Sequence, residues 1–198
     1  MKVFAVQTGI FGDHSNSNTL VNKIVSKLES KYEKVDVYSR DLSAKPLPYF
    51  DAQVAMALNT AAEDRNDAQQ ALADLSDTLI EEVKSADIIV LGVPMYNFGI
   101  PAQLKSWFDF IARAGATFKY TETGPVGLLA DRPVYIAAAR GGIHRDQTTD
   151  SQTAYLQTML AFLGLQSVSI VYAEGLAMGD DAKAASLSQF EAEVEELA

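Results

Sequence analysis

The sequence predicts an α/β protein built on a doubly wound, five-stranded parallel sheet. Short apolar runs rich in β-branched and aromatic residues alternate with longer segments that have helical periodicity. Several of the runs are continuously apolar rather than alternating in polarity, which is typical of strands buried on both faces. A βαβα alternation of this kind folds into a parallel sheet with helices on both faces.

The expected elements follow one another along the whole chain. The strands are expected at Val3–Gln7, Val35–Tyr38, 87–92, 133–137 and Val168–Tyr172, and the helices at 17–30, 66–85, 101–113, 151–163 and 182–197. The stretch 40–60 is expected to form a long crossover with a short helix at Asp51–Leu58. A further segment, Thr117–Pro125, is expected to form a hairpin with its turn at Gly124-Pro125.

The helix expected at 101–113 has the clearest pattern. Its apolar residues repeat at the spacing i, i+3, i+4, i+7, as Leu104, Trp107, Phe108 and Ile111. Pro101 suits the first turn of this helix, because its missing N–H has no partner there in any case. Trp107 is therefore expected in the core.

Composition limits both the number of domains and the function. A chain of 198 residues fits one domain, taken as residues 1–198. The absence of Cys excludes disulfides and thiolate chemistry, and the two His, His14 and His144, are too few to predict a metal site. No apolar run approaches the roughly 18 residues of a membrane span. The start of the chain resembles a strand rather than a signal peptide, so we expect no membrane association and a cytoplasmic location.

The net charge of −10 argues against a nucleic-acid partner, because such proteins need a basic face. The acidity is concentrated in residues 51–84 and 174–198, each with a net charge of −6. The terminal part is expected to be a solvated acidic run, with Glu191, Glu193, Glu195 and Glu196. The remaining chain can therefore hold an anionic ligand without a strong opposing field.

The loop after the first strand is rich in hydroxyl and amide groups. It opens the first helix but has neither the dinucleotide nor the Walker glycine pattern. The side chains of interest are Thr8, Ser15, Asn16 and Ser17. Hydroxyls and the free N–H groups of a helix start can hold a phosphate without Lys or Arg. The alternative is ordinary capping by Ser15 or Ser17, and His14 is expected to be a surface residue.

Two further loops follow the third and fourth strands, and doubly wound sheets bind ligands at these carboxyl ends. The loop 93–101 is stiff and apolar, which suits a flat ring such as a flavin; alternatively, it is a hydrophobic connection in the core. The loop 139–146 contains Gly141 and Gly142, which permit close backbone approach, with Arg140 and Arg145 adding positive charge. Its alternative is a plain glycine-rich turn.

Several motifs, in order along essentially the whole chain, resemble the FMN-dependent NADH:quinone oxidoreductases, also called azoreductases. They are Pro94-Met95-Tyr96-Asn97-Phe98, Pro101-x-Gln103-Leu104-Lys105, Arg113-Ala114-Gly115-x-Thr117-Phe118-Lys119-Tyr120-Thr121, Arg140-Gly141-Gly142-Ile143-His144 and Ala173-Glu174-Gly175. The resemblance implies a flavodoxin-like fold with strand order 2-1-3-4-5. It also implies a homodimer with one FMN per subunit.

The resemblance further implies where the cofactor and substrates bind. The phosphate of FMN would lie against Thr8, Ser15, Asn16 and Ser17, and the ring along Pro94, Met95, Tyr96, Asn97 and Phe98. Main-chain groups near Asn97, Phe98, Gly141 and Gly142 would meet the polar edge of the ring, and donors of the Arg140–Gly142 loop would stabilise negative charge on the reduced ring. Tyr120 and Phe162 match positions that line a substrate pocket completed by the partner subunit. His144 is a candidate proton source or a structural loop residue.

The implied reaction is a two-electron, ping-pong transfer from NADH or NADPH through FMN to quinones or azo compounds. Three departures from the family pattern concern FMN affinity and acceptor choice, namely Ala139 and Gly99 in place of polar residues and Thr8-Gly9 in place of two serines. The alternatives are a flavodoxin-type single-electron carrier, a hydrolase acting at the first loop, and a flavin-storing or regulatory protein. The hydrolase lacks an evident metal cluster or activated nucleophile.

Overall fold

The computed structural model describes residues 1–197 and contains the predicted parallel sheet. Its strands lie in the order β2-β1-β3-β6-β7, and every neighbouring pair in this sheet is parallel. Counted over the five sheet strands alone, this is the predicted order 2-1-3-4-5. The remaining two strands, β4 and β5, pair with each other as a separate antiparallel hairpin.

The elements match the predicted ones with shifts of a few residues at their ends. The strands are β1 (Lys2–Gln7), β2 (Asp36–Asp41), β3 (Ile88–Pro94), β4 (Phe118–Thr121), β5 (Gly124–Gly127), β6 (Val134–Ala139) and β7 (Val168–Ala173). The helices are α1 (Asn16–Lys31), α2 (Ala52–Asn59), α3 (Asp67–Ser85), α4 (Ala102–Ile111), α5 (Ser151–Leu163) and α6 (Asp180–Glu195).

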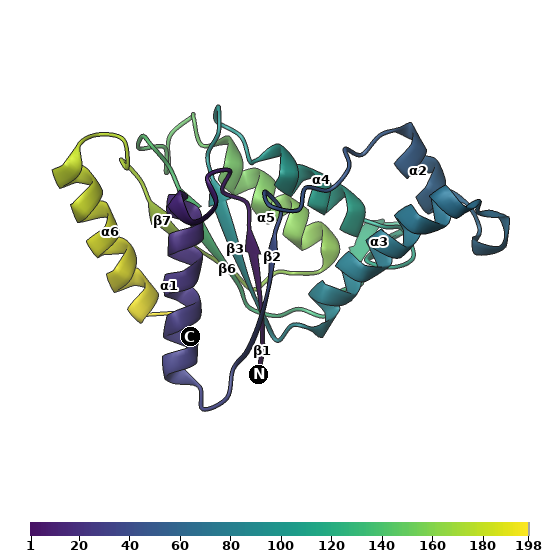
Figure 1. Ribbon diagram of the computed structural model, residues 1–198, viewed down its shortest axis with the longest axis horizontal. Coiled ribbons are helices and arrows are strands. Elements are labelled where there is room, and N and C mark those ends of the chain that lie inside the picture. Colours follow the sequence, from purple (N-terminus) through teal and green to yellow (C-terminus); the bar gives the residue numbers. More distant parts are fainter. Residues whose placement is uncertain (198) are drawn as a thin grey trace.

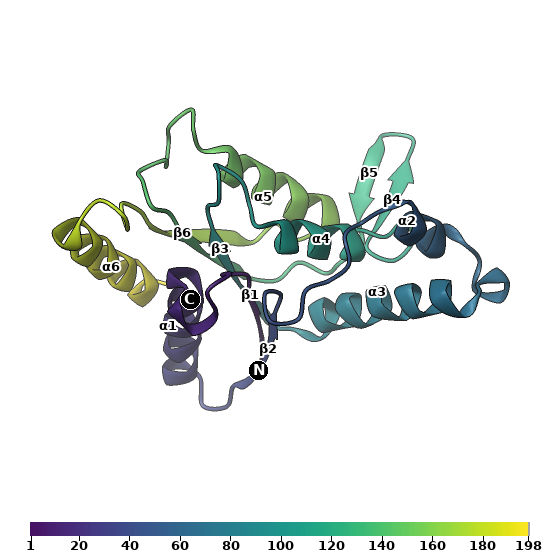
Figure 2. The same cartoon turned by 45° about the horizontal axis from the view of Figure 1, so that its top comes forward.

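Two apolar clusters lie on either side of the sheet, because successive side chains of a strand point to opposite faces. Phe4 and Val6 of β1 belong to the cluster with α3, α4 and α5, which includes the buried Trp107. Val3 and Ala5 belong to the cluster with α1 and α6. Figures 1 and 2 show these two groups of helices on opposite sides of the sheet. All seven residues of the central strand β3 are buried, as its continuous apolar run predicts.

The hairpin differs from its prediction in the position of its turn. The sequence favours a turn at Gly124-Pro125, but Thr121 pairs with Gly124, so the turn lies at Glu122 and Thr123. The hydroxyl of Thr121 donates to the carbonyl of Gly124 at 2.7 Å and accepts from the N–H of Thr123. The Thr121 side chain therefore stabilises a turn at Glu122 and Thr123, and Gly124 and Pro125 are the first residues of β5.

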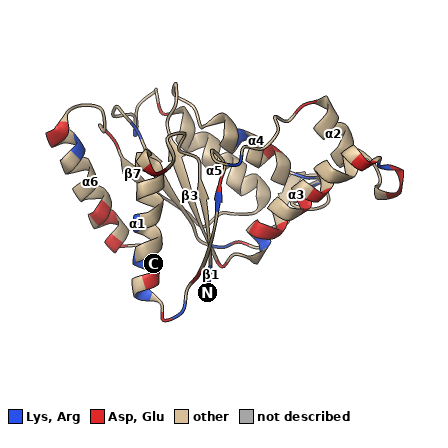
Figure 3. Ribbon diagram, viewed as in Figure 1, with Lys and Arg blue, Asp and Glu red and all other residues tan. Residues whose placement is uncertain are grey.

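The acidic residues gather on α3 and α6 (Figure 3). Glu191 and Glu195 of the terminal run are exposed, as expected, and they also form ion pairs with Lys23 and Lys27 of α1. These pairs join the two helices that cover the same face of the sheet. Exposed pairs of this kind each contribute about 0–1 kcal/mol, so they align the helices more than they stabilise them. Among residues 1–197, no helix is long and apolar enough to cross a membrane.

We predict that Asp131 makes the fold sensitive to acid. Hydrogen bonds from the side chain and backbone of Ser167 and from the N–H of Gln166 lower its pKa to about 2. The folded state therefore favours the carboxylate, and this stabilisation is complete above the ordinary pKa and is lost as the pH falls towards 2. Thermal unfolding of wild type and Asp131→Asn should differ at neutral pH and converge at acidic pH. A difference that is the same at every pH would contradict this.

Candidate functional site

The predicted loops meet in one cavity at the carboxyl ends of the strands. The cavity has a volume of about 190 Å³ and draws residues from the loops after β1, β3, β6 and β7. Its lining consists of Phe11, His14, Ser15, Asn16, Ser17, Pro94, Met95, Tyr96, Ala139, Arg140, Gly141, Leu176 and Ala177. Most of the residues predicted to bind the cofactor are therefore together, and the loop after β7 is an addition that the sequence did not single out.

The start of α1 offers unpaired hydrogen-bond donors to this cavity. The hydroxyl of Ser17 is buried and has no hydrogen-bond partner within residues 1–197. The N–H groups of Asn16 and Ser17 lie in the first turn of the helix, where no intrahelical acceptor exists. The capping alternative for Ser15 does not hold, because its hydroxyl accepts from the N–H of Phe11 instead of capping α1. Donors grouped at a helix start are suited to a phosphate.

The loop before α1 is held by residues with structural roles. The side chain of Asn18, which the sequence analysis missed, accepts from the N–H of Gly9 at 3.2 Å and donates to the carbonyl of Gly12 at 3.0 Å. A Cβ atom at Gly9 would lie 2.3 Å from the Cβ of Ser15, so this position has no room for a side chain. The loop is therefore packed closely behind the unpaired donors.

Thr8, the remaining predicted phosphate ligand, lies apart from the other three. This residue is fully buried, is not part of the cavity lining, and donates its hydroxyl hydrogen to the carbonyl of Gly92 at 2.6 Å. Its hydroxyl hydrogen is therefore not available to a phosphate in this arrangement. The side chain instead ties the end of β1 to the neighbouring strand β3.

The loop after β3 contains a strained two-residue turn. Asn97 and Phe98 have φ angles of 49° and 67°, and Tyr96 and Gly99 exchange two backbone hydrogen bonds of 3.0 Å around them. This geometry is that of a type I′ turn, which normally requires Asn or Gly. For a bulky residue such as Phe98, the left-handed conformation costs roughly 1–2 kcal/mol. The turn leaves Phe98 56% exposed, outside the lining of the cavity.

Residues at the start of α5 hold this strained turn in place, and no sequence signal predicts them. The buried side chain of Gln152 donates to the carbonyls of Pro94 at 3.0 Å and Gly99 at 2.8 Å. The hydroxyl of Ser151 donates to the carbonyl of Phe98. Together these bonds offset part of the strain, because the conformation is determined by groups outside the turn.

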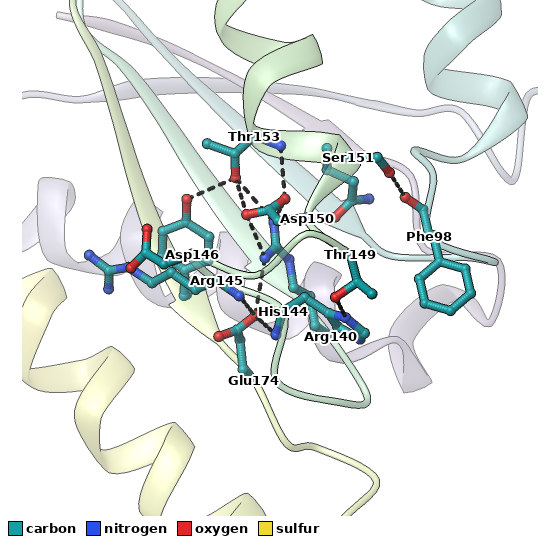
Figure 4. A network of polar contacts seen from close by, with 12 residues as sticks. Phe98, Arg140, His144, Arg145, Asp146, Thr149, Asp150, Ser151, Thr153 and Glu174 are labelled. Carbon is teal, nitrogen blue, oxygen red and sulfur yellow. Dashed lines mark hydrogen bonds and ion pairs between the residues drawn. The ribbon is translucent and has the colours of Figure 1, made fainter.

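The loop after β6 is organised around Arg140, and its predicted positive charge is neutralised. The buried guanidinium donates to both carboxylate oxygens of Asp150, at 2.8 and 3.0 Å, and to Glu174 at 3.1 Å (Figure 4). Burial raises the pKa of Asp150, but hydrogen bonds from Arg140 and Thr153 outweigh this effect and leave its pKa below the ordinary value. The backbone of Arg140 is also occupied, since its N–H donates to the carbonyl of Ala173 at 2.8 Å, and the Nε atom is the one group of this residue without a partner within residues 1–197.

The backbone of this loop presents N–H groups without protein acceptors. The carbonyls of Arg140, Gly141 and Gly142 accept from the N–H groups of residues 175–177, at 2.9 to 3.1 Å. The N–H groups of Gly141 and Gly142 have no acceptor within the described part of the chain. The loop is therefore fixed from one side and offers donors on the other.

His144 lies beside Phe98, outside the lining of the cavity. The two rings are perpendicular with their centroids 5.7 Å apart, and the Nδ1 atom of His144 shares a hydrogen bond of 2.9 Å with the hydroxyl of Thr149. Figure 4 shows the imidazole side chain among the loop residues near Phe98. An edge contact of this type connects the loops after β3 and β6.

Tyr120 and Phe162 lie away from this cavity. Both pack on Phe118, with ring centroids 5.5 and 4.4 Å from its own. Phe162 is eleven residues along α5 from Ser151, a separation of about 17 Å at the rise of an α-helix. Tyr120 is 75% exposed on the hairpin. The chain does not bring these two residues to its own cavity.

The assembled cavity suits a flat ligand that carries a phosphate. The unpaired donors at the start of α1 can hydrogen-bond a phosphate, and the apolar loop after β3 can pack against a flat ring. The N–H groups of Gly141 and Gly142 can donate to acceptors on the edge of that ring. FMN has each of these parts. Residues 1–197 hold no cluster of three or more His, Asp or Glu side chains suited to a metal ion.

The sheet order and the cavity define a flavodoxin-like protein. The model of the Flavodoxin_2 family, described as a flavodoxin-like fold, matches residues 1–198. Among curated proteins, the chain is 50% identical to the FMN-dependent NADH:quinone oxidoreductase of Cellvibrio japonicus over 96% of both chains. It is 49% identical to that of Alcanivorax borkumensis over 95% of both. The chain belongs to this family of oxidoreductases.

Solved structures agree with this assignment. An FMN-dependent NADH-azoreductase from Bacillus anthracis, determined in complex with FMN, superposes with a TM-score of 0.87. It is 27% identical and the alignment covers 100% of both chains. The resemblance first seen in short motifs therefore extends to the whole fold.

We predict that Gln152 stabilises the fold through the strained loop. Replacing it with Leu leaves the carbonyls of Pro94 and Gly99 buried without this donor and should lower the free energy of unfolding by about 2 kcal/mol. The matched control is Gln157→Leu, an exposed position on the same helix, which should change stability by no more than about 0.5 kcal/mol. Denaturant unfolding measures both, and equal effects would contradict the role of Gln152.

Proposed function

We propose that this protein is an FMN-dependent oxidoreductase that transfers two electrons from NADH or NADPH to quinones and azo compounds. The observation that carries the proposal is the buried Ser17 hydroxyl, which has no partner among residues 1–197 and lines the same cavity as the apolar loop after β3. Family membership supports the activity, since the relatives are named FMN-dependent NADH:quinone oxidoreductases. No observation favours the single-electron carrier.

In this proposal each loop binds one part of FMN. Ser17 and the N–H groups of Asn16 and Ser17 hold the phosphate, with Ser15 shaping the pocket behind them. Pro94, Met95, Tyr96, Asn97 and Phe98 lie along the ring. The N–H groups of Gly141 and Gly142 donate to its polar edge and stabilise negative charge there. Bound FMN supplies the hydride chemistry.

The chain's own residues orient the reactants and manage protons. The stiff loop after β3 fixes the plane against which a nicotinamide or a flat acceptor stacks, and this orientation provides much of the rate. His144 lies beside Phe98, which belongs to the loop that carries the ring in this proposal, and there its imidazole can supply a proton to the reduced acceptor. Its hydrogen bond to Thr149 sets the direction of the imidazole.

The proposed active form is a homodimer in which the partner subunit completes the substrate pocket. Tyr120 and Phe162 match pocket positions in the family resemblance, yet they are remote from the cavity of their own chain. A two-fold dimer places the same surface of each copy against the other, so the hairpin of one copy can cover the cavity of the other. In this proposal the chain acts as one FMN-binding domain in the cytoplasm.

The proposed function predicts the behaviour of the flavin spectrum. Protein incubated with FMN and desalted should keep the flavin bands, lose them on anaerobic addition of NADH, and recover them with benzoquinone. Ser17→Ala should weaken FMN binding about tenfold, because one hydrogen bond to a charged phosphate is lost. Ser30→Ala, an exposed hydroxyl on the same helix, is the matched control and should bind FMN as wild type does. Protein that keeps no flavin would refute the proposal.

Mixed dimers test the shared pocket. Ser17→Asp places a negative charge where the phosphate binds, and Tyr120→Ala removes the residue attributed to the partner. If each pocket is shared, mixing the two weakly active variants creates heterodimers with one intact pocket, in roughly a quarter of all sites. NADH-dependent quinone reduction should rise accordingly after mixing. Activity that stays at the average of the two variants would show that each pocket belongs to a single chain.

A further inference from the structure

Glu174, directly after β7, accepts three hydrogen bonds through a single carboxylate oxygen. Its Oε1 atom accepts from the guanidinium of Arg140 at 3.1 Å, from the N–H of His144 at 2.8 Å and from the N–H of Arg145 at 2.9 Å (Figure 4). Its side chain is largely buried. One carboxylate oxygen therefore joins the end of β7 to both ends of the segment 140–145.

A second carboxylate fixes the same guanidinium from another element. Asp150 precedes the first residue of α5 and binds Arg140 through both its oxygens, while its Oδ1 atom also accepts from the N–H of Thr153 at 3.1 Å. The guanidinium carbon of Arg140 lies over the ring of Tyr172, 4.9 Å from the ring centroid. Arg140 is thus held from β7 and α5 at once, and its backbone has little freedom.

These contacts determine which way the loop presents its amides. The carbonyls of residues 140–142 are already bonded to the N–H groups of residues 175–177. Glu174 accepts hydrogen bonds from the N–H groups of His144 and Arg145. The chain is therefore held both before and after Gly141 and Gly142. Within this segment the N–H groups of Gly141, Gly142 and Ile143 are left without an acceptor among residues 1–197, and those of the two glycines lie nearest to Arg140.

We infer that Glu174 is a positioning residue for the cofactor site. It acts through Arg140 and the 144–145 backbone to direct the N–H groups of Gly141 and Gly142 towards the ring of FMN and to set the His144 imidazole against Phe98. This role rests on the proposed function, and it assigns to Glu174 no contact with the cofactor itself. Preorganised amides of this kind bind a ring edge without the cost of ordering the loop.

The first test separates positioning from general stability with three variants. Glu174→Leu removes the acceptor and should weaken FMN binding about tenfold or more. Glu174→Gln keeps an oxygen at Oε1 that can accept all three hydrogen bonds, so it should restore the affinity to within a few-fold of wild type. Glu82→Leu breaks the remote fork pair with Arg40 and should lower thermal stability without weakening FMN binding.

The FMN affinities of wild type and variants distinguish a failure of the Glu174 inference from a failure of the proposed function. Wild type that binds no FMN refutes the function itself. If wild type binds FMN, the role of Glu174 is overturned when folded Glu174→Leu binds equally well, or when Glu82→Leu loses as much affinity as Glu174→Leu.

Hydrogen exchange on the wild-type protein tests the same role without a variant that must fold. The amides of His144 and Arg145 should already be protected in the FMN-free protein, because Glu174 accepts them. The amides of Gly141 and Gly142 should exchange rapidly without FMN and slowly with it. Rapid exchange at His144 and Arg145 in the FMN-free protein would overturn the inference.

Discussion

A parallel sheet sends the carboxyl ends of all its strands to the same edge, and the site of this protein depends on that constraint. Loops as far apart in sequence as Phe11 and Ala177 meet there because β1, β3, β6 and β7 are successive neighbours in the sheet. Each loop is ordinary when considered alone. Their combination places a helix start, an apolar turn and free glycine amides around a single cavity.

The site is costly to maintain, and buried polar contacts maintain it. Phe98 occupies a conformation that a bulky residue avoids, and Arg140 carries a charge into the interior. The hydrogen bonds of Gln152 offset the backbone strain at Phe98. The ion pairs with Asp150 and Glu174 offset the free energy of burying the Arg140 charge. The start of α5 contributes to both, so this helix end couples the loops after β3 and β6.

The elements were predictable from sequence because they depend on local periodicity, and the strand order was predictable from the family resemblance. The loops of the site were predictable from the rule for parallel sheets, together with family motifs. The roles of Thr8, Asn18, Gln152 and Glu174 were not, because each depends on a partner far away in the chain, such as Gly92 for Thr8. The hairpin turn was misplaced because the hydroxyl of Thr121 outweighs the usual preference for Gly-Pro.

A crystal structure of the FMN-bound protein tests most directly whether the three loops form one cofactor site. The phosphate should lie within hydrogen-bond distance of the Ser17 hydroxyl and the N–H groups of Asn16 and Ser17. The ring should lie between the turn at Asn97 and Phe98 and the amides of Gly141 and Gly142. FMN bound elsewhere, for example in the groove between α1 and α6, would contradict this account.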